Sequence, residues 1–170
     1  MQNVATANEV FITGLKNAHA MENQALSIMK PQLKRIEHYP EVAAQLDLHI
    51  TETEGQIQRI EEILDRLSES ASGLKDAALS ASGAMAALSH TMASDEILKN
   101  SFANFAFEHF EIAAYTSLLT AGEESGAADL PLLRQNLDEE LRMAEWLQDN
   151  LPAVTRSYSA LSGSGERADV

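Results

Sequence analysis

A charged quartet inside an apolar helical stretch most constrains what this 170-residue chain can fold into. The quartet, Glu-His-Phe-Glu at 108–111, lies within the largely apolar run 102–115. In a helix, Glu108, Glu111 and Tyr115 share one face. The apolar stripe beside that face comprises Phe102, Phe105, Ile112 and Leu119. A buried carboxylate must be paired, protonated or bound to metal, because desolvation costs several kcal/mol. The fold must therefore provide partners that offset the cost of burying Glu108 and Glu111.

Composition narrows the partners that such acids could have. The chain has no cysteine, so a metal site would need oxygen and imidazole ligands. Its formal net charge of −14 argues against nucleic acid and anionic membrane surfaces and favours cations. No apolar run approaches the roughly 20 residues that span a bilayer, and the start lacks the pattern of a signal peptide. We therefore expect one soluble, cytoplasmic domain.

Helical periodicity recurs in four segments, and no alternating β-branched run indicates a strand, so the sequence predicts an all-α protein. The expected helices cover about 8–37, 41–67, 95–122 and 130–150. Pro31 should kink the first helix because it removes a backbone donor. Segment 68–94, rich in Ser, Ala and Gly, predicts a crossover with a short helix around 74–88. Residues 1–155 should form the bundle, and 156–170 a disordered C-terminal tail.

Each expected long helix carries glutamate on its inward side near its midpoint. These glutamates are Glu22, Glu52, Glu108 with Glu111, and Glu140. The spacing from Glu22 to Glu52 is 30 residues and that from Glu111 to Glu140 is 29, which indicates a duplicated helical hairpin. Midpoints of similar antiparallel helices meet in one layer. The five acids should therefore converge.

Converging carboxylates favour a site for two divalent cations, because five carboxylates carry −5 against +4. His49 stands three residues before Glu52, which reverses the more familiar Glu-x-x-His order. Their positions in the second helix of each hairpin make Glu52 and Glu140 the expected bridging ligands. His19 is a further ligand candidate.

Structural explanations compete with this one. A single Glu near an apolar stripe is commonly incidental, and a lone histidine more often forms a core hydrogen bond than a metal bond. Four glutamate-bearing helices at matched depth favour the metal site. Tyr115 and Gln56 are expected to hydrogen-bond the carboxylates, whereas His109 points away from Glu108 and Glu111.

Four strings in the chain resemble the YciE/YciF family of ferritin-like, rubrerythrin-like bacterial stress-associated proteins. The strings are ENQAL at 22–26, HITETEGQIQRIE at 49–61, EHFEIAAY at 108–115 and LDEE at 137–140. The resemblance implies a ferritin-like four-helix bundle with a long helical crossover between its second and third helices, and a dimetal centre. It carries the ligand role onto Glu22, His49, Glu52, Glu108, Glu111 and Glu140. Ala144 departs from the family pattern, which often has Asp there.

Three functions remain open at this level. The first is an iron or manganese enzyme that handles O2 or peroxide, and the second is a protein that sequesters these metals. The third is a bundle whose acids are solvated or protonated and whose apolar surface forms a homodimer. The expected cofactors are two divalent ions, iron or manganese, with zinc possible in a purified sample.

Overall fold

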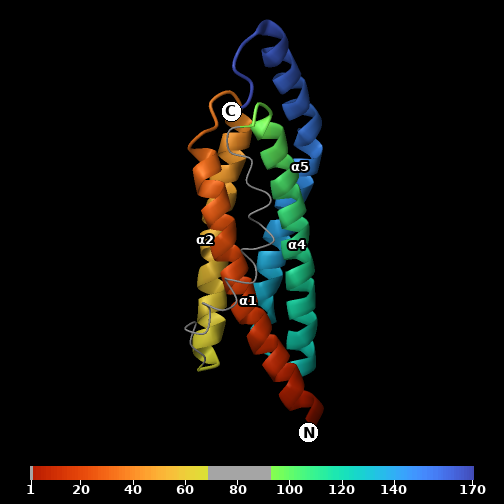
Figure 1. The fold of residues 1–170 in the computed structure, drawn as a ribbon. Coiled ribbons are helices and arrows are strands. Elements are labelled where there is room, and N and C mark those ends of the chain that lie inside the picture. Colours follow the sequence, from red (N-terminus) through yellow and green to blue (C-terminus); the bar gives the residue numbers. More distant parts are fainter. Residues whose placement is uncertain (1, 69–92) are drawn as a thin grey trace.

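The computed structural model describes residues 2–68 and 93–170. Within these ranges the chain forms four long helices and no strand: α1 (Gln2–Leu33), α2 (Pro40–Arg66), α4 (Glu96–Ser125) and α5 (Leu130–Ser164). The helices pack side by side as one elongated bundle (Figure 1). The predicted all-α four-helix bundle is therefore confirmed. The short crossover helix predicted around 74–88 lies outside the described residues.

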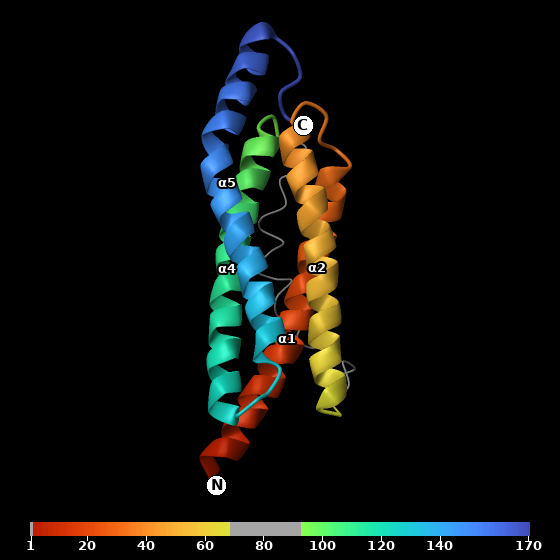
Figure 2. The same ribbon diagram turned by 180° about the vertical axis from the view of Figure 1, so that it is seen from behind.

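The helices form two neighbouring hairpins. α1 packs on α2, α4 packs on α5, and α1 also packs on α4 (Figures 1 and 2). The fourth pair of neighbours, α2 and α5, makes far fewer close backbone approaches than the other three. None of the described helices is long and apolar enough to cross a membrane.

The core follows the predicted stripes on three helices. Buried apolar side chains from all four helices form one cluster that includes Phe11, Leu15, Met29, Ile60, Ile63, Leu118, Leu133, Met143 and Leu147. Each fully buried side chain of this kind stabilises the fold by about 1.5–3 kcal/mol. The same stripes carry Glu22, His49 and Glu140 into the interior. The apolar core therefore holds a polar layer between its two ends.

On α4 the buried face differs from the prediction. Phe102, expected in the apolar stripe, is 52% exposed, whereas Glu108, Glu111 and Tyr115 are buried. Phe102 stands nine residues before Glu111, which places the two side chains about 180° apart around the helix. Because the carboxylates face the centre of the bundle, Phe102 must face outward.

The ends of α4 also differ slightly from the sequence expectation. Asp95 is the N-cap residue, and the C-cap residue after Ser125 is Gly126, whose φ of 75° is left-handed. The helix continues through Gly122, where it was expected to end. A Cβ atom at Gly122 would lie 2.5 Å from Leu130 Cδ2 and 2.9 Å from Phe11 Cε2. Glycine there permits close packing instead of ending the helix.

The expected disordered tail is wrong for the described C-terminal residues. α5 continues past Asn150 and through Pro152 to Ser164, because Val154, Tyr158 and Leu161 extend its apolar stripe against Tyr39 and Ile97.

After α5 the chain folds back onto the bundle. The Tyr39 hydroxyl donates to the Ala168 carbonyl at 2.6 Å, and the Ile97 N–H donates to the Asp169 carbonyl at 2.9 Å. Ala168 and Val170 are buried. These contacts supply the backbone partners that hold the last residues in place.

Candidate metal centre

All four described helices contribute a side chain to the polar layer. Glu22 comes from α1, His49 from α2, Glu108 and Glu111 from α4, and Glu140 from α5, and each is at most 2% exposed. Spacing of three residues places Glu108 and Glu111 on one face of α4. Sequence spacing predicts that five glutamates converge. Four of them, Glu22, Glu108, Glu111 and Glu140, are buried together with His49, whereas the side chain of Glu52 is 20% exposed.

Four of the residues form a compact group. One ligand atom from each of His49, Glu108, Glu111 and Glu140 lies within 4.8 Å of the others, so this group could hold a metal ion. His49 Nε2 lies 3.3 Å from Glu108 Oε2 and 3.5 Å from Glu140 Oε2.

Glu22 is adjacent to this group. Its carboxylate is fully buried, and its Oε1 accepts a hydrogen bond from the Tyr115 hydroxyl at 2.5 Å. Its charge acts on both Glu111 and Glu140. Glu22 therefore extends the cluster on the α1 side.

Glu52 takes a different position. Its side chain is 20% exposed, its Oε2 lies 3.4 Å from His49 Nδ1, and its Oε1 accepts a bond from Arg142 Nη2 at 3.1 Å. The hydrogen bond from His49 lowers the pKa of Glu52, against the smaller opposing effect of burial. Glu52 is thus an ionised carboxylate at the edge of the layer.

Burial dominates the electrostatics of the interior acids. It raises the pKa of Glu22 to about 8, although the Tyr115 hydrogen bond opposes the shift. Burial, followed by repulsion from Glu22, raises the pKa of Glu111 and of Glu140 well above the ordinary value. Burial alone would lower the pKa of His49, but Glu108, Glu52 and Glu140 together raise it well above its ordinary value. Without a cation, the layer favours protonation.

Several buried carboxylate oxygens in the polar layer have no hydrogen-bond partner. Among the described residues, the buried carboxylate oxygens with no hydrogen-bond partner are Glu22 Oε2, Glu108 Oε2, both oxygens of Glu111, and Glu140 Oε2. Unpartnered polar atoms of this kind are uncommon in folded proteins and need an explanation. Carboxylate oxygens with one imidazole are the donors that divalent iron and manganese accept. The donor set therefore fits a metal centre.

Hydrogen bonds hold the carboxylates from outside the layer, as predicted for Tyr115 and Gln56. Gln56 Nε2 donates to Glu140 Oε1, and Tyr115 donates to Glu22. Asn136 Nδ2 donates to the Tyr115 oxygen at 2.9 Å, and Arg59 Nε donates to Asn136 Oδ1 at 2.5 Å. Arg59 also pairs with Glu139.

Sequence reasoning missed the part that Asn136, Arg59 and Glu139 play in this network. Asn136 stands four residues before Glu140, on the same face of α5, and is fully buried. A polar residue at that spacing was the signal that could have identified it.

The other histidines considered lie apart from the cluster. His19, the further ligand candidate, has its Nε2 2.9 Å from Glu61 Oε1 and its Nδ1 3.3 Å from Asn23 Nδ2. His109 is exposed and packs edge-on against Phe105, with ring centroids 4.5 Å apart. Its predicted orientation away from the acids is consistent with this position.

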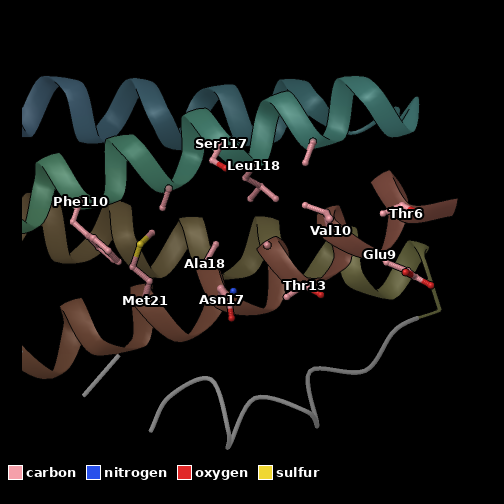
Figure 3. Close-up of a pocket in the computed structure, with 13 residues that line it drawn as sticks. Thr6, Glu9, Val10, Thr13, Asn17, Ala18, Met21, Phe110, Ser117 and Leu118 are labelled. Carbon is pink, nitrogen blue, oxygen red and sulfur yellow. The ribbon is translucent and has the colours of Figure 1, made fainter. Parts of the chain in front are cut away.

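A cavity of about 650 Å³ lies between α1 and α4 (Figure 3). Its lining is mostly apolar and includes Val10, Met21, Phe110 and Leu118. Glu9 is its one acidic lining residue, and none of the predicted ligands lines it. The cavity therefore lacks the donors of a metal site.

The comparisons with known proteins agree with this architecture. A model of the family described as a domain of unknown function, DUF892, matches residues 6–160. Protein YciF of Escherichia coli (strain K12) is 30% identical over 149 residues, which cover 81% of this chain and 86% of YciF.

Solved structures extend the likeness to the fold. A protein from Xanthomonas campestris pv. campestris superposes with a TM-score of 0.78 at 28% identity, covering 93% of this chain and 99% of that one. The crystal structure of the E. coli stress protein YciF gives a TM-score of 0.65 at 25% identity, covering 85% and 94%. With the family match over most of the chain, these findings show that the protein belongs to the YciE/YciF family of DUF892 proteins.

Proposed function

We propose that the buried polar layer binds two divalent metal ions, iron or manganese. The observation that carries this proposal is the set of unpartnered carboxylate oxygens on Glu22, Glu108, Glu111 and Glu140, gathered around His49. The ligands would be these four glutamates and His49 Nε2. Ion pairs do not fully explain the arrangement. Among the described contacts no lysine or arginine bonds to these four carboxylates, and His49 lies near only two of them, Glu108 and Glu140.

Charge supports two ions over one. Four ionised carboxylates carry −4, which two divalent cations balance at +4. With only one divalent ion, a net charge of −2 would remain in the interior, where unpaired charge is costly. Two-metal sites typically hold their ions about 3.5–4 Å apart.

We further propose that the centre handles O2 or peroxide. Bound iron or manganese would supply the redox chemistry. The protein would hold the ligands in a layer closed by apolar side chains, and Tyr115 and Gln56 would fix the carboxylates of Glu22 and Glu140 by hydrogen bonds. The alternative on the same site is sequestration, in which the ions are bound and stored without reaction.

Metal analysis of protein purified without chelators is the direct test. We expect about two ions per chain, and zinc is an acceptable occupant of a purified sample because it accepts the same donors. A chelated sample that takes up no Fe(II) or Mn(II) would contradict the proposal. A suitable control is the variant Glu123→Ala, because Glu123 is exposed on α4 and pairs with Arg134.

Fe(II)-loaded protein exposed to peroxide separates the two functions. Oxidation of bound iron faster than that of free iron would support redox handling. Full occupancy with oxidation no faster than that of free iron would leave sequestration as the function.

We also propose a homodimer, since Val10 and Phe110 are 55% and 56% exposed along the cavity between α1 and α4 (Figure 3). Light scattering after size-exclusion chromatography would measure the mass. A monomer at micromolar concentration would contradict the proposal.

A further inference from the structure

Glu52 differs from the other predicted ligands in how its oxygens are used. Glu22, Glu108, Glu111 and Glu140 each keep at least one buried oxygen without a partner. In Glu52, both oxygens are engaged: Oε2 faces His49 Nδ1 at 3.4 Å, and Oε1 accepts a bond from Arg142 at 3.1 Å. Both carboxylate oxygens of Glu52 are therefore already used in contacts outside the group of residues that could hold an ion.

The His49 ring separates the two environments. Its Nδ1 faces Glu52, while its Nε2 faces Glu108 Oε2 and Glu140 Oε2 at 3.3 and 3.5 Å. A neutral imidazole has one N–H and one lone pair, and the hydrogen-bond partner of one nitrogen decides which is which. An ionised carboxylate can only accept a hydrogen bond. An ion held by His49, Glu108 and Glu140 would take the lone pair of Nε2, so the remaining ring proton would lie on Nδ1 and face Glu52.

We infer that Glu52 is a positioning residue and not a metal ligand: it holds the Nδ1 proton of His49 so that the Nε2 lone pair faces the ions. This inference rests on the proposed function, because it concerns the same centre. Arg142 holds Glu52 in turn, through a contact between α2 and α5. A carboxylate that orients a metal-binding histidine in this way typically changes metal affinity about 10- to 100-fold when it is removed.

This role differs from the bridging role that sequence spacing predicts for Glu52. To bridge two ions, Glu52 would have to release both His49 and Arg142 and turn inward from its 20% exposed position. The reversed order, with histidine before glutamate, places Glu52 beside the back of the imidazole instead of beside its metal-facing nitrogen. The three-residue spacing of His49 and Glu52 predicts two metal ligands, but here it gives one ligand, His49, and a carboxylate that holds the His49 ring in place.

Two substitutions of Glu52 distinguish a positioning role from direct metal binding. Glu52→Gln keeps an oxygen that accepts the Nδ1 proton, whereas Glu52→Ala removes it. If Glu52 positions His49, both variants bind two Mn(II) ions per chain, with affinity reduced about 10- to 100-fold in Glu52→Ala and much less in Glu52→Gln. If Glu52 is a ligand, both variants lose an ion or lose affinity to the same degree. Competition with a chelator of known affinity measures both quantities.

Glu54→Ala is the matched control. Glu54 lies on the same helix, is 49% exposed, and accepts a hydrogen bond from Lys30 at 2.8 Å. This variant should bind two Mn(II) ions with unchanged affinity. Thermal unfolding of each chelated variant checks that the bundle still forms.

Nitrogen-15 spectra of the zinc-loaded protein give a readout that a purely structural role would not change. In the wild-type protein, the His49 ring should show a slowly exchanging Nδ1 proton and an Nε2 resonance shifted by the bound metal. Glu52→Ala should lose the slowly exchanging Nδ1 proton, whereas Glu52→Gln should keep it. Wild-type protein with two ions and a Glu52→Gln variant with one would overturn this inference alone. Wild-type protein that binds no ion would overturn the proposed function and this inference together.

Discussion

Among the acids that the structure describes, Glu111 alone has both carboxylate oxygens buried without a hydrogen-bond partner. We expect Glu111→Ala to remove at least one of the two metal ions, because the four remaining ligands no longer surround both. The fold should survive without metal, since the substitution removes a carboxylate whose pKa burial and repulsion from Glu22 raise. Elemental analysis and circular dichroism measure the two effects.

The control for this experiment is again Glu123→Ala, on the exposed side of α4. It should retain both ions. Retention of two ions by Glu111→Ala would mean that Glu111 is not a ligand. Loss of helical signal in the chelated variant would mean that this carboxyl group supports the apo fold.

Tyr115 has a hydroxyl group with a partner on each side, and it is fully buried. Tyr115→Phe would leave Glu22 Oε1 without its donor, and Asn136 Nδ2 would keep only the longer hydrogen bond to the Gln56 carbonyl at 3.5 Å. We expect the free energy of unfolding of the chelated protein to fall by about 1–3 kcal/mol, which is the cost of buried polar groups without partners. Denaturant titration measures it. Tyr158→Phe removes a hydroxyl whose hydrogen bond to the Ser94 carbonyl is exposed, so it should change this free energy far less, and equal losses would contradict the role of burial.

At the scale of residues, much of the site is predictable because a carboxylate on an inward stripe is costly wherever the helices pack. That argument predicts Glu22, Glu111 and Glu140 as site residues without knowledge of the fold. It cannot find which nitrogen of His49 faces Glu52, or that Arg142 from α5 engages Glu52, because those contacts depend on side-chain geometry between helices.

Among the helices, α5 shows how a C-terminal segment is fixed. The Tyr39 hydroxyl bonds to the Ala168 carbonyl in a buried contact. Tyr39→Phe removes this bond and should lower the free energy of unfolding by about 0.5–1.5 kcal/mol, or more if the carbonyl stays buried without a partner. Thermal unfolding measures the change. Metal stoichiometry should not change, because Tyr39 lies outside the polar layer, and loss of an ion would show that the two regions are coupled.

Prediction of the elements succeeds where periodicity is strong and fails where tertiary contacts decide. The four helices follow from their apolar stripes. The length of α5 was underestimated because Pro152 and the serines after it resemble a helix end, whereas packing of Val154 on Tyr39 and Ile97 maintains the helix. The orientation of α4 was only partly predicted. Apolar residues lie on two adjacent faces of this helix, and the face that is buried is the one that carries Glu108, Glu111 and Tyr115.

For the whole molecule, the acid layer predicts how stability changes with pH in the chelated protein. The pKa of Glu22 rises from 4.5 to about 8 on folding, and the pKa values of Glu111, Glu140 and His49 also rise. Groups with raised pKa values stabilise the fold fully below their unfolded pKa, and that stability is lost as pH rises through the folded pKa. We therefore expect the chelated protein to be less stable at about pH 8 than at about pH 5, by several kcal/mol.

Metal should reverse this dependence, because its ligands bind in the deprotonated form and binding strengthens as pH rises. Thermal midpoints of chelated and Mn(II)-loaded protein at both pH values provide the measurement. Equal midpoints of the chelated protein at the two pH values would show that burial and mutual repulsion do not raise the pKa values of these acids.

The sparse backbone packing between α2 and α5 has a consequence for the rate at which ions exchange. Polar side chains also link these two helices, through the ion pairs of Glu52 with Arg142 and of Arg59 with Glu139. Among the described helices, α2 and α5 are the neighbouring pair with the fewest close backbone approaches, so we expect them to part most readily. Ions would then pass through this seam during brief local openings, so their residence time would depend on how often the seam opens and not on ligand affinity alone.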